Sequence, residues 1–326
     1  MLLTPFWAYA VTLWCLASPA GAAGVQLLDS NASLSGAIWY PCASEPKLLA
    51  LGDLAVGADF GLTGVKDCPV TGRKLPLIIF SHGRGGWFGG HHDTAEALAD
   101  AGFIVAAINH PGDTANDSSR RNTLSVWASR PADMVRLLDF MLNDWKDREA
   151  VDPARIGFFG FSLGGYTGLV LAGGNPDTQR VAARCTEKTG ICEELHNGAA
   201  LGDLPHDARI KAAVLADAAV TGAFTQESLA GIKIPLQIWR SELGGYGVDA
   251  GGTARVAGVL PGKPEIHIVP AGHYAFLAPC SKQLATAVPR ICTDDPPNFD
   301  RAAFHRDLNA SVTAFFREHL DSGGTR

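Results

Sequence analysis

The sequence lacks several features that mark whole classes of protein. It has no lysine- or arginine-rich run and a net charge of −6, which argues against a nucleic-acid partner or an anionic membrane surface. No two cysteines have CxxC spacing, which argues against a zinc site. After residue 23, no apolar run is long enough to span a bilayer. The expected partner is therefore a small or neutral molecule.

Residues 1–23 have the pattern of a secretory signal peptide. An uncharged apolar segment is followed by small residues, and cleavage is expected near Ala22 or Ala23. The segment lacks the usual positive charge at its start, so a retained anchor or a misassigned start is the alternative. We expect a secreted or periplasmic protein in which residues 24–326 form a single domain.

Six cysteines follow this leader: Cys42, Cys68, Cys185, Cys192, Cys280 and Cys292. An even number in an exported chain favours disulfide bonds, and pairing in sequential order would close three short loops. Other connectivities remain open, and buried free thiols in a cytoplasmic protein are the alternative.

Apolar runs of strand length alternate with helical patterns along most of the chain. This alternation is typical of an α/β fold with a mostly parallel central sheet and helices on both faces. The stretch "GLTGVKDCPVTG", residues 61–72, is expected to be a loop. Residues 175–208 are irregular and long for a connection, and long loops are often lids or binding segments. We expect a small insert or cap there.

The clearest motif is GxSxG, centred on Ser162 in "RIGFFGFSLGGYTGLVLA". An apolar run leads into the serine and a helical pattern follows, which places the hydroxyl on a sharp strand-to-helix turn. A β-carbon at the neighbouring Gly160 or Gly164 would collide with nearby chain. The helix N-terminus also favours a developing negative charge. Ser162 is the predicted nucleophile, and an ordinary tight turn is the alternative.

A serine hydroxyl needs a base to take its proton. For a serine on such a turn, the acid and then the histidine follow in the chain. His273, in "VPAGHYAF", comes directly after the last predicted strand, whereas His267 lies within that strand. We predict His273 as the base, with a solvated loop histidine as the alternative.

Three acidic residues could orient this imidazole and stabilise its charged form. Asp217 and Glu242 each end a predicted strand, at the sheet edge where α/β proteins build their sites. Asp249 lies in the following glycine-rich loop. The pattern alone leaves Asp217 and Glu242 as equal candidates.

The loop "SHGRGGWF", residues 81–88, follows an earlier predicted strand. An oxyanion hole needs two N–H donors, one after the nucleophile and one from such a loop. Leu163 and Arg84 are the predicted donors, and a structural turn without a ligand is the alternative. His82 is expected to brace the loop through hydrogen bonds.

Other side chains near these motifs could line a substrate pocket. The candidates are His82, Trp87, Phe88 and His110. Trp87 and Phe88 form a pocket wall or pack in the core, and His110, in "NHPGD", lines a cleft or belongs to a turn.

The consecutive residues His91, His92 and Asp93 look like metal ligands. Neighbours on a helix point apart, however, so they are expected to be solvated first-turn residues.

Several blocks together resemble a known family. "PLIIFSHGRGG", "GFIVAAINHPG", "RPADMVRLLDF", "DPARIGFFGFSLGGYTG", "RIKAAVLADAA" and "VPAGHYAFL" are similar to α/β-hydrolases grouped with platelet-activating factor acetylhydrolases and predicted dienelactone hydrolases. The resemblance extends over about residues 34–320 and implies the α/β-hydrolase fold. It implies that the acid is Asp217, in "LADA", with Glu242 as the reserve, and it supports Arg84 and Leu163 as donors.

Two departures from this family limit what the resemblance implies about the substrate. Dienelactone hydrolases use a cysteine nucleophile, whereas this chain has Ser162, so a dienelactone is a poor substrate candidate. The insert also lengthens the segment between nucleophile and acid, so phospholipid specificity is not carried over.

Together these residues predict a serine ester hydrolase that acts through an acyl-enzyme. The expected substrate is a small-molecule or lipid-like ester, and no metal or organic cofactor is required. The alternatives are a serine peptidase or acyltransferase with the same triad, or a non-catalytic binding protein on the same fold.

Overall fold

The computed structural model describes residues 22–28, 34–55, 62–293 and 295–321. Within them, ten strands form a sheet in the order β10-β9-β8-β7-β5-β6-β2-β1-β4-β3. The strands are β1 (Ala22–Leu28), β2 (Gly36–Cys42), β3 (Lys47–Leu48), β4 (Thr63–Lys66), β5 (Leu75–Ser81), β6 (Ile104–Ile108), β7 (Val151–Phe161), β8 (Ile210–Ala216), β9 (Leu236–Ser241) and β10 (Glu265–Val269). The six strands from β10 to β6 are parallel to their neighbours, and β2 runs antiparallel to both β6 and β1.

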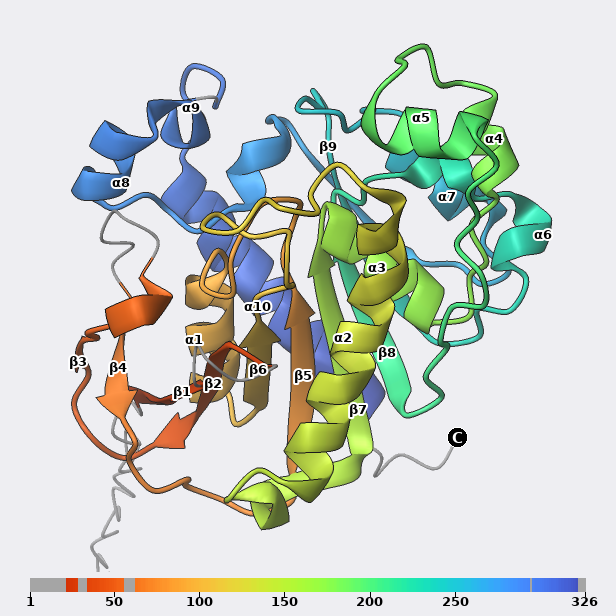
Figure 1. Cartoon of the computed structure of the whole chain (residues 1–326). Coiled ribbons are helices and arrows are strands. Elements are labelled where there is room, and N and C mark those ends of the chain that lie inside the picture. The colour runs from red at the N-terminus through yellow and green to blue at the C-terminus, as the bar shows by residue number, and fades with distance from the viewer. Residues whose placement is uncertain (1–21, 29–33, 56–61, 294, 322–326) are drawn as a thin grey trace, which may run out of the picture.

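Helices cover both faces of this sheet, as the sequence predicts (Figure 1). The α-helices are α1 (His92–Asp100), α2 (Leu124–Asn143), α3 (Leu163–Leu171), α4 (Thr178–Ala182), α5 (Gly190–His196), α6 (Gln226–Leu229), α7 (Gly252–Val259), α8 (Lys282–Ala287), α9 (Pro289–Cys292) and α10 (Arg301–Leu320). Helices α2 and α3 pack on one face, and α1 and α10 pack on the other. No helix in the described part of the chain is long and apolar enough to cross a membrane.

The continuous apolar runs follow from this two-sided burial. In β5, Ile78 packs in the core under α1 and α10, while Ile79 packs in the core under α2 and α3. Successive side chains of a strand point to opposite faces, so a strand buried on both faces must be apolar at every position. The same arrangement brings the carboxyl ends of β5, β7, β8 and β9 to one edge of the sheet.

Strand β4 occupies a segment for which the sequence predicts only loop. Its residues Thr63–Lys66 pair in parallel with β1. The prediction was wrong here because the strand is short, contains a glycine and depends on a distant partner. A β-carbon at Gly64 would overlap the side chain of Val25, so the close approach to β1 requires glycine.

The proposed leader lies mostly outside the described residues. Residues 1–21 are outside them, whereas Ala22 and Ala23 belong to β1, which pairs with β2. The assignment of residues 1–23 as a signal peptide and of residues 24–326 as one domain stays a prediction.

Three cysteine pairs lie at disulfide distance, in the sequential order considered above. The Cα–Cα separations are 6.4 Å for Cys42–Cys68, 5.4 Å for Cys185–Cys192 and 5.9 Å for Cys280–Cys292. The second pair lies in the predicted insert, which contains α4 and α5, and the third lies around α8 and α9. In Figure 1 these four helices lie toward the end of the molecule to which β5 and β7 point.

Candidate active site

Ser162 stands on a sharp turn between β7 and α3. Its φ of 56° and ψ of −116° lie in a region that side-chain-bearing residues rarely adopt. A β-carbon on Gly164 would overlap the carbonyl oxygen of Ser81, and one on Gly160 would overlap that of Gly164. The flanking glycines are therefore required by close backbone contacts, and the predicted strand-to-helix turn is confirmed.

Asp217 and His273 form a buried hydrogen bond. Asp217 directly follows β8, and its Oδ2 lies 2.7 Å from His273 Nδ1, with 1% and 4% of the two side chains exposed. Glu242, the reserve acid, is exposed, and Asp249 is exposed and paired with Arg255. Of the acidic candidates, Asp217 is the one that the structure places on the imidazole.

Ser241, at the end of β9, is a partner of Asp217 that the sequence reasoning missed. Its backbone N–H donates to Asp217 Oδ1 at 2.8 Å, and its hydroxyl donates to Oδ2 at 2.7 Å. These bonds hold both oxygens of the carboxylate that contacts His273. The available signal was its position at a strand end, the same signal that pointed to Glu242 one residue later.

Ser162 and the Asp217–His273 pair lie at one edge of the sheet. The Ser162 N–H donates to Ala216 O, at the end of β8, at 2.9 Å. The imidazole of His273 stacks on the ring of Phe161, with centroids 4.6 Å apart and planes at 22°. Phe161 directly precedes Ser162, so the imidazole of His273 packs beside the turn that carries the serine.

The loop after β5 passes directly over Ser162. A β-carbon on Gly83 would lie 3.1 Å from the Ser162 β-carbon. The carbonyl oxygen of Gly83 accepts hydrogen bonds from His82 Nδ1 at 2.6 Å, Arg130 at 3.1 Å and the Gly86 N–H at 3.1 Å. Since C=O and N–H point in opposite directions in a trans peptide, these bonds aim the N–H of Arg84 away from Arg130.

Arg130, from α2, supports this loop from beneath and was not singled out from the sequence. It also donates to the carbonyl oxygen of His82 at 2.6 Å and pairs with Asp113 at 2.7 Å. Both side chains of the pair are fully buried, and Asp113 in turn accepts from the Gly85 N–H at 2.8 Å. A buried pair of charges is stable only when further hydrogen bonds satisfy it, and here the loop backbone supplies them.

His82 and His110 belong to the same buried network, because they are 4% and 1% exposed. The His110 N–H donates to His82 Nε2, so His82 carries its proton on Nδ1 and donates it to Gly83. His110 contacts Ser81 Oγ at 2.9 Å and Asp133 at 2.8 Å. Burial, and then the charge of Arg130, hold the pKa of both histidines well below the usual value. Both rings are neutral supports beneath the loop.

Trp87 and Phe88 also lie in the interior. Each is 3% exposed, and their rings meet edge to face with centroids 4.7 Å apart. Phe88 packs further against Trp39, at 6.1 Å. Of the two roles left open for this pair, the structure favours core packing.

The expectation that residues 91–93 are solvated was wrong. His91 and His92 are 3% and 8% exposed, and Asp93 bonds to His305 Nδ1 at 2.7 Å. The first turn of α1 is buried because α10 packs across it. Burial lowers the pKa of His91 to about 4. Within the described residues, no group of three or more histidine, cysteine, aspartate or glutamate side chains could hold a metal ion.

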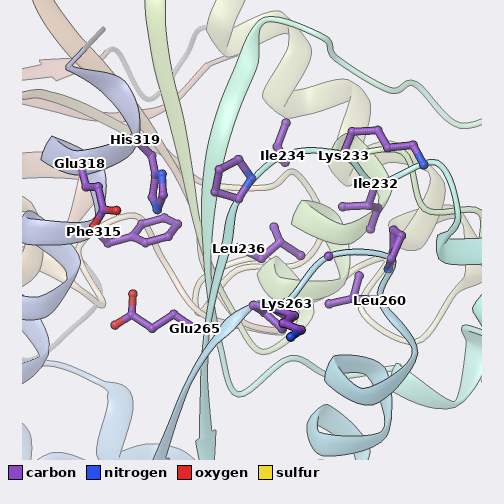
Figure 2. Close-up of a pocket in the computed structure, with 14 residues that line it drawn as sticks. Ile232, Lys233, Ile234, Leu236, Leu260, Lys263, Glu265, Phe315, Glu318 and His319 are labelled. Carbon is purple, nitrogen blue, oxygen red and sulfur yellow. The ribbon is translucent and has the colours of Figure 1, made fainter. Parts of the chain in front are cut away.

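A pocket of about 670 Å³ lies at the opposite end of the sheet (Figure 2). Its walls come from the segments around Leu236 and Glu265, at the amino ends of β9 and β10, and from Phe315 and His319 of α10. Open α/β sheets build their sites at the carboxyl ends of the strands, where Ser162 lies. We therefore separate this pocket from the candidate active site.

Comparisons with known proteins agree with this architecture. The profile of a family described as the alpha/beta hydrolase fold matches residues 76–242. A solved structure of a ferulic acid esterase from Streptomyces cinnamoneus is similar, with 19% sequence identity, a TM-score of 0.62, and coverage of 95% of this chain and 93% of that chain. No curated protein matches the chain.

Proposed function

Because the chain belongs to the alpha/beta hydrolase fold family, we propose that it is a serine hydrolase that cleaves carboxylic esters. The observation that carries this proposal is the buried 2.7 Å bond between Asp217 and His273, at the same sheet edge as the Ser162 turn. A buried imidazole held by a carboxylate is the arrangement that a serine nucleophile needs beside it.

In the first half of the reaction, Ser162 Oγ attacks the ester carbonyl carbon and His273 takes the hydroxyl proton. The negative charge that develops on the carbonyl oxygen is stabilised by the N–H groups of Leu163 and Arg84. Asp217 stabilises the imidazolium without taking the proton. His273 then gives its proton to the departing alcohol, and the acyl group stays on Ser162.

In the second half, a water molecule replaces the alcohol. His273 takes a proton from this water as it attacks the acyl carbon, and the same two N–H groups hold the oxyanion again. Collapse of the intermediate releases the carboxylic acid and returns the proton to Ser162. Each step uses groups of this chain and water alone.

Export from the cell is part of the proposal. Three cysteine pairs at disulfide distance support it, because disulfides persist in oxidising compartments. The sequence blocks similar to platelet-activating factor acetylhydrolases support an esterase of that group, while the insert between α3 and β8 argues against assuming their phospholipid substrates.

Labelling with a fluorophosphonate probe, which reacts with activated serines, tests the nucleophile. We expect labelling of the wild type and of Ser129→Ala, a change in α2 outside the site, and none of Ser162→Ala. Short-chain p-nitrophenyl esters should be hydrolysed much faster than matched peptide amides. Folded wild type that is not labelled, or faster cleavage of the amides, would contradict the proposal.

A further inference from the structure

The loop after β9 carries exposed side chains, and its backbone bonds to Ala271 and His273. Leu243 is 62% exposed and Tyr246 is 47% exposed. The ring of Tyr246 stacks on that of Tyr274, with centroids 4.0 Å apart and planes at 29°. Tyr274 follows His273 directly, and their rings lie 5.8 Å apart. We call Leu243, Tyr246 and Tyr274 the tyrosine platform.

The loop that carries Tyr246 contains a tight turn with Tyr246 at its centre. Gly245 and Val248 exchange two backbone hydrogen bonds, of 3.0 and 2.9 Å, so Tyr246 and Gly247 are the central residues of a tight turn. Both have positive φ, 52° and 86°, as in a type I′ turn. Asparagine or glycine adopts this conformation without strain, whereas a bulky side chain does not. The chain holds a tyrosine where the backbone alone would favour a small residue.

Hydrogen bonds connect the loop that carries Leu243 and Tyr246 to the proposed catalytic residues. The Gly244 N–H donates to Ser241 Oγ at 3.1 Å, and the same hydroxyl donates to Asp217. The N–H of His273 donates to Gly244 O at 2.8 Å. The loop is therefore bonded to Ser241, which holds the Asp217 carboxylate, and to the backbone N–H of His273, and these bonds fix its place beside His273.

The order of the reaction indicates which part of an ester lies next to His273. The imidazolium gives its proton to the departing alcohol, whereas the acyl group stays bound to Ser162. The alcohol part must therefore leave along the imidazole. Flat apolar groups stack well on exposed aromatic rings, and small alkyl groups gain little from them.

We propose that the tyrosine platform is a subsite for the alcohol part of the ester and that it selects aromatic alcohols. The inference rests on the proposed function and adds the substrate class to it. A flat ring of the alcohol packs on Tyr246 while Leu243 contacts its edge. The platform contacts the alcohol only until the acyl-enzyme forms, so it has no effect on hydrolysis of the acyl-enzyme.

Esters that share one acyl group and differ only in the alcohol distinguish a role of Tyr246 in alcohol binding from a role in acyl binding or in folding. Benzyl, 2-naphthylmethyl and ethyl butyrate share an acyl group and release alcohols of similar basicity. We expect Tyr246→Ala to lower kcat/KM for the two aromatic esters by about 3- to 10-fold and to change that of ethyl butyrate by less than about 2-fold. Tyr246→Phe should keep wild-type values, because it keeps the ring.

Two controls make the result decisive. Ile266→Ala removes an exposed apolar side chain of β10, 48% exposed, and should leave all three esters unchanged. The rate at which the butyryl-enzyme is hydrolysed should be equal in wild type and Tyr246→Ala. Thermal unfolding of each variant verifies that it folds, and Leu243→Ala gives a second test of the same subsite.

The outcomes distinguish this inference from the proposed function. Equal losses on all three esters, no loss on any of them, or losses that follow the acyl group in a matched series of ethyl esters would overturn the subsite. If the wild type hydrolyses no ester and takes no fluorophosphonate label, the proposed function itself fails.

Discussion

Ser241 holds both oxygens of the Asp217 carboxylate, one through its backbone N–H and the other through its hydroxyl. The hydroxyl bond fixes the oxygen that contacts His273, so the serine acts through the carboxylate. We expect Ser241→Ala to lower kcat by about 10-fold, since a hydrogen bond to a charged group contributes about 1.5–3 kcal/mol. Ser241→Thr, which keeps the hydroxyl, should retain most of the activity. Equal kcat in the alanine variant and wild type would show that the backbone bond suffices.

We expect substitution of Asp217, the proposed acid, to lower kcat more than substitution of Ser241. Asp217→Asn keeps the shape but removes the charge that stabilises the imidazolium, and we expect kcat to fall by about 10⁴-fold, as for a triad aspartate elsewhere. Glu242→Gln is the matched control, because its side chain is exposed. Steady-state kinetics on p-nitrophenyl butyrate measures both. A severe loss in Glu242→Gln with a mild one in Asp217→Asn would reverse the assignment.

We expect substitution of Arg130 to lower both the stability of the fold and the rate of the proposed reaction. Arg130→Met removes the closer of the two cations beside the buried Asp113, Arg130 at 2.7 Å, and leaves only Arg121 at 3.7 Å. We therefore expect the free energy of unfolding to fall by about 3 kcal/mol. The Gly83 carbonyl also loses a donor, so the Arg84 N–H is less well oriented and kcat should fall by up to about 10²-fold. Urea denaturation and kinetics measure the two effects. Arg148→Met is the control, because Arg148 and its partner Glu149 are both exposed, and it should cost less than about 1 kcal/mol. Similar losses in both variants would refute the special role of Arg130.

His91 makes stability depend on pH. Burial lowers its pKa to about 4 in the folded protein, against about 6.5 in the unfolded chain. Between these values the unfolded chain binds the proton and the folded protein does not, so stability falls as the pH falls below 6.5. From pH 7.5 to pH 5 this group should cost about 2 kcal/mol.

The variant His91→Phe isolates that contribution, because it keeps an aromatic ring between Phe159 and Phe161. Its stability relative to wild type should rise by about 2 kcal/mol from pH 7.5 to pH 5, measured by urea denaturation at both values. A difference that does not change with pH would mean that His91 titrates normally. The comparison cancels other groups, including Asp100, whose pKa burial raises to about 6 and which opposes the trend.

The cysteine pairs predict a defined peptide map. Digestion without reducing agent should yield three linked pairs, Cys42–Cys68, Cys185–Cys192 and Cys280–Cys292. The first closes the longest loop, of 26 residues in sequence separation, so replacing both of its cysteines by alanine should cost the most stability, about 3 kcal/mol. Six free thiols in protein from an oxidising compartment would contradict both the pairing and the proposed export.

Much of the candidate site follows from local pattern. The GxSxG pattern identified the turn at Ser162 from the sequence alone, although only the contact that requires Gly160 lies within the turn, and Gly164 is required by Ser81 of β5. The acid is different, because Asp217 and Glu242 both end strands. Side chains alternate along a strand, so once Ser241 faces Asp217, Glu242 must point away. Only the register of β9 against its neighbours decides this.

Other errors come from partners distant in the chain. His91 and Asp93, at the start of α1, look solvated from the local pattern. In the structure His91 packs against Phe159 and Phe161 of β7, and Asp93 bonds to His305 of α10. Pro131 is a residue typical of the first turn of a helix, yet it lies inside α2, which begins at Leu124. The Leu124 N–H is capped by Glu194 of the insert at 2.6 Å, a contact that no local pattern encodes.

The segment holding α4 and α5 leaves the sheet after the helix that follows Ser162 and rejoins it at the strand that leads to Asp217. One end of the segment continues α3, which packs on β7, and the other end enters β8, the strand beside β7. A change in the length or sequence of this segment therefore alters no residue of β7 or β8, the strands that lead to Ser162 and Asp217. Variation in this segment is therefore a route by which substrate selectivity changes while the proposed catalytic residues stay the same.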